Sequence, residues 1–206
     1  MTIGVLSGTI VELAVSRDDV VLQKPEDVRF LVPVFHTSNA CCGAATAYLL
    51  RRIAYRAGAY APGIQEQIFH ELNTSRDGGS IEKVQRWFNG RVSILHELGY
   101  RLQCRRVATP TPAILEWVKQ GKGYRGAMLP TSFAKLHASA EEIMGHAIGL
   151  TIDRLEAKGD EDLVMIDPWP GDAGDAKDRG KLSPQLELAH KERNFHALVY
   201  FWVGWS

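Results

Sequence analysis

Residues that could together carry out nucleophilic hydrolysis occur at three places in this chain. Two adjacent cysteines, Cys41 and Cys42, stand where a short extended stretch changes into a run of helix-forming residues. A thiol at a helix N-terminus lies in the positive field of the helix dipole, which lowers its pKa toward the reactive thiolate. A histidine, His146, and an aspartate, Asp167, follow later. A thiol, an imidazole base and a carboxylate that orients the base are the parts of a cysteine hydrolase.

The element that must hold the thiol is a helix over residues 43–56. Its apolar positions Leu49, Leu50 and Ile53 follow helical spacing, and Gly58 is a typical stop signal. We therefore expect a helix with one buried face and with Cys42 in its first turn.

The base and its carboxylate are expected on neighbouring strands. His146 alternates in phase with the apolar residues of a strand that starts at Gly145, so its side chain should lie at the rim of the core. A polar loop through Lys158 would then return the chain as a second strand over residues 163–166. Antiparallel pairing of these strands would place Asp167 near His146.

The remaining pattern predicts helices first and strands afterwards. A helix is expected from Ser80, its N-cap, to Gly99, with a break at Asn89-Gly90, and another from its cap Thr111 to Gly121. Short apolar runs predict strands at 9–15, 127–129, 147–152, 163–166 and 195–203. The expected class is α+β: one domain over residues 1–206, with a helical part at about 36–121 packed on an antiparallel sheet at about 126–206.

Composition excludes several other kinds of function. The 24 basic residues equal the 24 acidic ones, so no global field favours nucleic acid, and no apolar run is long enough to insert into a membrane. Three cysteines without a CxxC pair predict neither a disulfide framework nor a metal site, and no cofactor motif is present. Without a secretory signal pattern we expect a cytoplasmic protein, or one delivered by a secretion system that needs no signal peptide.

The motifs Cys42-Gly43, Gly145-His146 and Asp167-Pro168, in this order, resemble those of papain-like cysteine peptidases. The layout is most similar to the bacteriocin-processing, double-glycine leader peptidases and covers roughly residues 36–171. The resemblance implies a papain-like fold with Cys42 as nucleophile, His146 as base and Asp167 as the orienting residue. It also implies a peptide or protein substrate and a thioester acyl-enzyme.

Two departures from the family pattern leave alternatives open. The oxyanion-hole glutamine that the family carries six positions before its cysteine is His36 here, so His36 or Asn39 would have to replace it as donor. Cys41 competes for the nucleophile role, although the glycine after Cys42 favours Cys42. The alternative functions are an acyltransferase or transamidase and an inactive binding module, and either form could serve as a bacterial effector or toxin.

Overall fold

The structure of the 206-residue chain is a computed structural model that describes residues 41–59, 80–97, 99, 101–137, 145–152, 163–167 and 184–203. The strand expected at residues 9–15 lies outside this part of the chain. The described residues form one five-stranded sheet and six helices, so the expected α+β class is confirmed.

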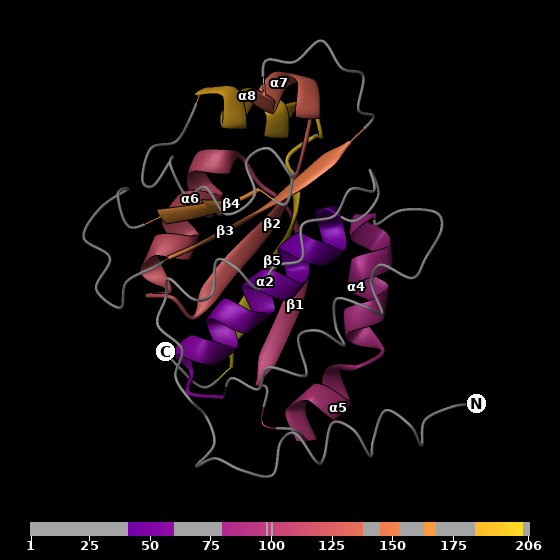
Figure 1. The fold of residues 1–206 in the computed structure, drawn as a ribbon, viewed down its shortest axis with the longest axis vertical. Helices are drawn as coiled ribbons and strands as arrows, with labels where there is room; N and C mark the ends of the chain where they lie inside the picture. Colours follow the sequence, from indigo (N-terminus) through magenta and orange to yellow (C-terminus); the bar gives the residue numbers. More distant parts are fainter. Residues whose placement is uncertain are drawn as a thin grey trace.

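The sheet is antiparallel at every pairing, with the strand order β1-β5-β2-β3-β4 (Figure 1). The last strand in sequence, β5, lies between β1 and β2, while β3 and β4 are neighbours in both sequence and space. The five strands are β1 (Leu102–Ala108), β2 (Arg125–Thr131), β3 (His146–Ile152), β4 (Leu163–Ile166) and β5 (His196–Trp202).

Helices and strands alternate along the chain more than expected. Strand β1 falls inside the segment assigned to the helical part, and two helices follow β2 in the segment assigned to the sheet. Strand β1 pairs with β5 along its whole length, from Leu102 opposite Trp202 to Ala108 opposite His196. Its inner residue Leu102 is fully buried, whereas Arg105 and Arg106 are exposed, as suits an edge strand. The pairing with β5 is long-range, and a local pattern does not reveal it.

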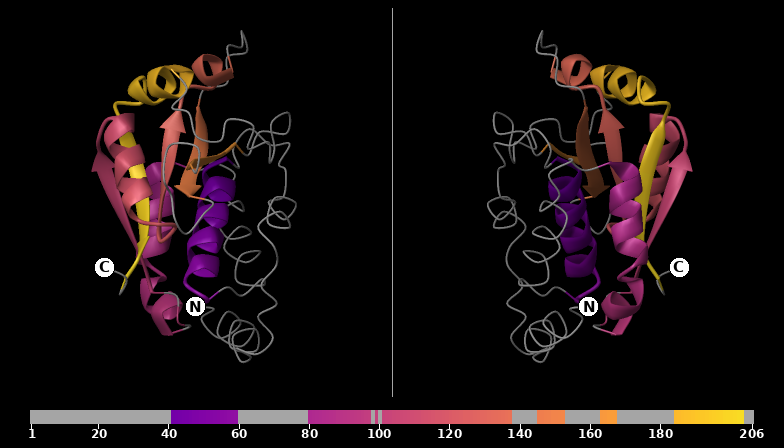
Figure 2. Two further views of the ribbon diagram at one scale, coloured as in Figure 1. Left: turned by 90° about the vertical axis from the view of Figure 1, so that its left-hand side faces the viewer. Right: turned by 90° about the vertical axis from the view of Figure 1, so that its right-hand side faces the viewer.

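The helices cover both faces of the sheet, which gives three layers (Figure 2). Helices α2 and α4 pack on one face, and α6 and α8 pack on the other with α7 against α8. Each face has its own cluster of buried apolar side chains. The bounds are α2 (Cys41–Arg56), α4 (Ile81–Asn89), α5 (Val92–Glu97), α6 (Thr111–Gln120), α7 (Phe133–His137) and α8 (Pro184–Lys191).

Helix α2 approaches the sheet closely because two strand residues lack a side chain. A Cβ on Gly126 would lie 2.9 Å from the side chain of Leu49, and one on Gly149 would lie 3.2 Å from it. The buried stripe of the helix, Ala45, Leu49 and Ile53, is fully shielded from solvent by this contact. The two glycines therefore set the distance between α2 and strands β2 and β3, and with it the place of the helix N-terminus.

The structure confirms one predicted cap and corrects another. The Ser80 side chain accepts a hydrogen bond of 3.2 Å from the Lys83 amide, and the expected break falls between α4 and α5. At α6 the N-cap is Pro110, not Thr111. The Thr111 side chain is buried and lies 2.8 Å from His190 Nδ1 of α8, so its hydroxyl joins two helices and does not cap its own.

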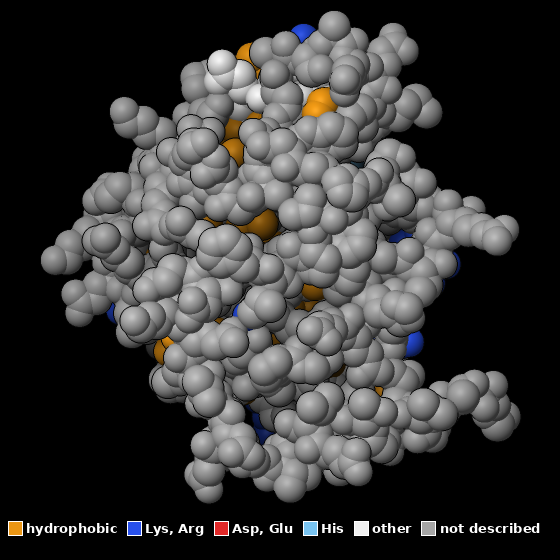
Figure 3. All heavy atoms as spheres, in the orientation of Figure 1, with side chains coloured by type: hydrophobic (Ala, Val, Ile, Leu, Met, Phe, Trp, Pro, Cys, Tyr) orange, Lys and Arg blue, Asp and Glu red, His pale blue; other side chains and the backbone are white. Residues whose placement is uncertain are grey.

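In the view of Figure 3 the visible hydrophobic side chains of the described residues show as small separate areas. None of the described helices has the length and apolar character that crossing a membrane requires.

Candidate active site

The histidine and the aspartate singled out in the sequence lie in direct contact. His146 begins β3 and Asp167 follows β4 directly, and the register that pairs Gly149 with Ile166 brings the two side chains close on one face of the sheet. His146 Nε2 lies 2.6 Å from Asp167 Oδ1, and both side chains are only 4% exposed. A short, shielded contact of this kind holds the imidazole in one orientation.

A third residue restrains the imidazole from α7. The ring of Phe133 meets that of His146 edge-on, with centroids 5.4 Å apart and an interplanar angle of 88°. Phe133 is itself buried. No local pattern in the sequence indicates this contact, because it depends on how α7 lies against the start of β3.

The thiol that reaches His146 belongs to Cys41. Cys41 stands at the N-terminal end of α2 as described and is partly exposed. Hydrogen bonding and charge from His146, together with the backbone of Ala147, lower the pKa of its thiol, so these groups lie next to one another. Since Nε2 of His146 faces Asp167, Nδ1 is the ring nitrogen left for the thiol.

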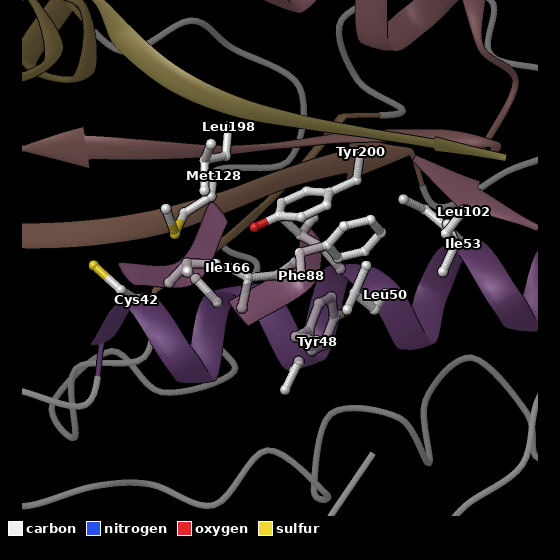
Figure 4. Close-up of a cluster of buried hydrophobic side chains, with 14 of the residues drawn as sticks. Cys42, Tyr48, Leu50, Ile53, Phe88, Leu102, Met128, Ile166, Leu198 and Tyr200 are labelled. Carbon is white, nitrogen blue, oxygen red and sulfur yellow. The ribbon is translucent and has the colours of Figure 1, made fainter. Parts of the chain in front are cut away.

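Cys42 is turned away from this contact and into the core. It is 6% exposed and belongs to the buried cluster between α2, α4 and the sheet. Figure 4 shows its sulfur turned toward the strands that carry Met128 and Leu198. Successive residues of a helix point about 100° apart, so two adjacent cysteines cannot both face His146. The structure therefore corrects the expected placement of Cys42 beside the base.

The electrostatics separate the two thiols further. The pKa of Cys41 is lowered to about 5, first by a hydrogen bond with Cys42 and then, against the effect of burial, by the hydrogen bond and charge of His146. The pKa of Cys42 is raised well above its usual range by the hydrogen bond with Cys41, by burial and by the negative charge of Cys41. Of the two, Cys41 is the thiol that ionises, and the protonated thiol of Cys42 donates a hydrogen bond to the Cys41 sulfur.

His146 is the cation that matches this thiolate. Burial acts to lower its pKa, but the hydrogen bonds with Asp167 and Cys41 and their negative charges outweigh burial and raise the pKa to about 9. Between about pH 5 and pH 9 the two groups therefore form a thiolate-imidazolium pair.

His36 and Asn39, the expected oxyanion donors, lie outside the described residues, as does Pro168 after Asp167. Among the described side chains, no group of three or more His, Cys, Asp or Glu residues is arranged to hold a metal ion. The arrangement described is that of an activated thiol with an oriented base.

Comparison of the chain with protein-family models, curated proteins and solved structures gave no match. The geometry of Cys41, His146 and Asp167 is therefore the basis for assigning a function to this chain.

Proposed function

We propose that this protein is a cysteine hydrolase of the papain-like type that cleaves amide bonds, with Cys41 as nucleophile, His146 as general base and acid, and Asp167 as the orienting residue. The observation that carries the proposal is the contact of 2.6 Å between His146 Nε2 and Asp167 Oδ1, supported by the interaction of the Cys41 thiol with the same imidazole, which lowers the pKa of Cys41. A buried imidazole and carboxylate beside a thiol are not needed for packing, since apolar side chains would fill the same space without loss of solvation.

The surrounding elements support the papain-like assignment. The thiol comes from the N-terminal end of a helix, and the base and the carboxylate come from adjacent antiparallel strands on which that helix packs. The order along the chain, cysteine before histidine before aspartate, is the order that the family resemblance implies. The departure is the position of the thiol, which is one residue earlier than the Cys-Gly motif indicates.

The first chemical step is acylation. The Cys41 thiolate attacks the substrate carbonyl carbon, and the carbonyl electron pair moves onto oxygen to give a tetrahedral oxyanion. Backbone N–H groups at the N-terminal end of α2 have no partner within the helix and are the proposed donors to this oxyanion, with His36 or Asn39 as the proposed side-chain donor. Collapse breaks the C–N bond, His146 Nδ1–H protonates the departing amine, and a thioester remains.

The second step reverses these roles. His146 Nδ1, now neutral, takes a proton from a water molecule whose oxygen attacks the thioester carbon. The C–S bond breaks, the carboxylic acid leaves, and the thiolate-imidazolium pair is restored. Asp167 keeps its hydrogen bond to Nε2 throughout, so Nδ1 faces the reacting atoms in both steps.

The proposal is tested by exchanging each cysteine separately for alanine and measuring the cleavage of a diverse peptide mixture by mass spectrometry. We expect Cys41→Ala to lose turnover by about 10³-fold or more. Cys42→Ala should retain turnover, but the acid limb of its pH–rate profile should lie at higher pH. The reason is that the Cys41 thiolate loses the hydrogen bond that Cys42 donates. Loss of cleavage in Cys42→Ala, with cleavage retained in Cys41→Ala, would contradict the assignment of Cys41 as nucleophile. Transfer of the acyl group to added amines in place of water would make the protein an acyltransferase.

A further inference from the structure

A cavity lies on the face of the sheet that α2 does not cover. It occupies about 430 Å³ between α6 and the strands β1 and β5. The cavity exists because α6 packs mainly on β2 and β3, so the far side of this face, toward the β1 edge, is left open beside the helix. Its volume is within the range of about 300 to 1,000 Å³ that is usual for small-molecule sites.

The walls of the cavity are apolar and aromatic. Ile114 of α6 and Val199 of β5 are buried residues of the core on this face. Trp117 of α6 and Phe201 of β5 meet edge-on, with ring centroids 6.2 Å apart and an interplanar angle of 86°. These side chains offer flat apolar surface to the body of a ligand.

Two arginines add positive charge to this apolar lining. The Arg125 guanidinium lies 4.9 Å from the Trp117 ring centroid and donates one hydrogen bond, of 3.0 Å, to the Trp117 carbonyl. The Arg105 guanidinium lies 5.3 Å from the Phe201 ring centroid, and its polar contact is a long one, 3.5 Å, with Gln103. A guanidinium has five N–H donors, so both arginines retain donors for a ligand.

The charge of these arginines is not balanced by a carboxylate in the part of the chain that the structure describes. Within the described part of the chain, neither guanidinium is paired with a carboxylate, and the residues that line the cavity include no aspartate or glutamate. The next residue on β1, Arg106, points to the opposite face and pairs with Glu82 at 2.8 Å. Among the neighbouring arginines of β1, the one without a carboxylate partner is therefore Arg105, which lines the cavity.

We propose that this cavity is a binding site for a small organic oxyanion, a carboxylate or phosphate carried on an aromatic or apolar body. The guanidinium groups match the paired oxygens of such a group, and they lie over the rings of Phe201 and Trp117 that would contact its aromatic or apolar body. The site is on the other face of the sheet from α2 and does not depend on the proposed hydrolase activity.

The test is a titration of the full-length protein with phenyl phosphate and with benzoate, followed by isothermal calorimetry and by the indole N–H signals in NMR spectra. Inorganic phosphate is the control for a ligand that has the charge but no ring. Benzyl alcohol is the control for a ligand that has the ring but no charge. We expect one aromatic oxyanion to bind with saturation and to shift the Trp117 signal, assigned with Trp117→Phe. The preferred probe identifies the oxyanion as a phosphate or a carboxylate.

Neighbouring residues on β1 provide a matched pair of variants. Arg105→Gln should weaken binding about 10-fold, as expected for the loss of one charged hydrogen-bonding partner, and Arg106→Gln should leave binding unchanged. Both arginines are exposed, so neither variant should unfold the protein, which circular dichroism checks. Equal weakening in both variants, equal binding of benzyl alcohol, or no shift at Trp117 with either oxyanion would overturn the proposal.

Discussion

The reactivity of Cys41 toward iodoacetamide as a function of pH is the sharpest consequence of the geometry. Alkylation requires the thiolate, and Cys41 with a pKa of about 5 is ionised across the neutral range. We expect its alkylation rate to rise with a midpoint near pH 5 and then to stay level until His146 loses its proton near pH 9. In His146→Ala the midpoint should move up toward that of an ordinary thiol.

The alkylation rate of Cys41 relative to that of an ordinary thiol depends on two opposing factors, the fraction of thiolate and the nucleophilicity of that thiolate. At pH 6 about 90% of a thiol with a pKa of about 5 is thiolate, against about 0.1% for an ordinary pKa of 9.0, a ratio of about 900. The thiolate of lower pKa is intrinsically less nucleophilic, by about 40- to 100-fold for this difference in pKa. Cys41 should therefore react about 10- to 20-fold faster than an ordinary thiol at pH 6, and more slowly above about pH 7.

The assay can separate the three cysteines in one experiment. Cys41 and Cys42 share the tryptic peptide of residues 30–51, and its fragment ions distinguish alkylation at one from alkylation at the other. Cys104 is an internal reference, because burial raises its pKa to about 12 and it should remain unmodified. The variant Cys42→Ala shows how far the neighbouring thiol contributes to the low midpoint.

Two results would refute this reasoning. Faster modification of Cys42 than of Cys41 in the native protein would mean that the orientation of the N-terminal end of α2 is different. An alkylation midpoint near pH 9 for Cys41, unchanged in His146→Ala, would mean that the thiol and the imidazole do not form an ion pair. In that second case an inactive binding module would be the better interpretation of the fold.

Three further predictions concern the support of the site. Asp167→Asn should lower kcat by between about 10- and 10⁴-fold, and it should move the basic limb of the pH profile to lower pH, as steady-state kinetics would reveal. Gly126→Ala should destabilise the fold by about 1–3 kcal/mol in urea unfolding, because the added Cβ would press on α2. The control Gly90→Ala should not, because a Cβ there would meet no atom closer than 3.5 Å. Burial lowers the pKa of His190 in the folded state, so the unfolded chain takes up its proton first as pH falls. Unfolding free energy should therefore decline below about pH 6.5, and less steeply in His190→Gln.

Local signals in the sequence were sufficient for most of the elements. The helix over residues 43–56, the break at Asn89-Gly90 and the strands after Gly126 all correspond to observed elements, because periodicity and turn residues act within a few positions. The contact of His146 with Asp167 was also predictable, because a polar loop between two short strands nearly dictates antiparallel pairing. The pairing of β1 with β5 was not predictable, because the two strands lie far apart in the chain and β1 falls within the segment assigned to the helical part.

The identity of the reactive thiol shows how a motif and a periodicity can disagree. The glycine after Cys42 favoured Cys42, but Cys42 also lies at helical spacing from Ala45, Leu49 and Ile53, which are all fully buried. Cys41 is outside that stripe. The helical phase of the sequence therefore places Cys42 on the buried side of α2, in disagreement with the motif, but it does not show which thiol meets His146.

The sequence alone determined that a thiol, an imidazole and a carboxylate would be carried by a helix and two adjacent strands, because each of these elements follows from local spacing. Tertiary structure decided which thiol meets the imidazole, since this depends on how far and at what rotation α2 packs against Gly126 and Gly149. It also decided the charges, because the pKa values of Cys41 and His146 depend on burial and on partners that come from separate parts of the chain.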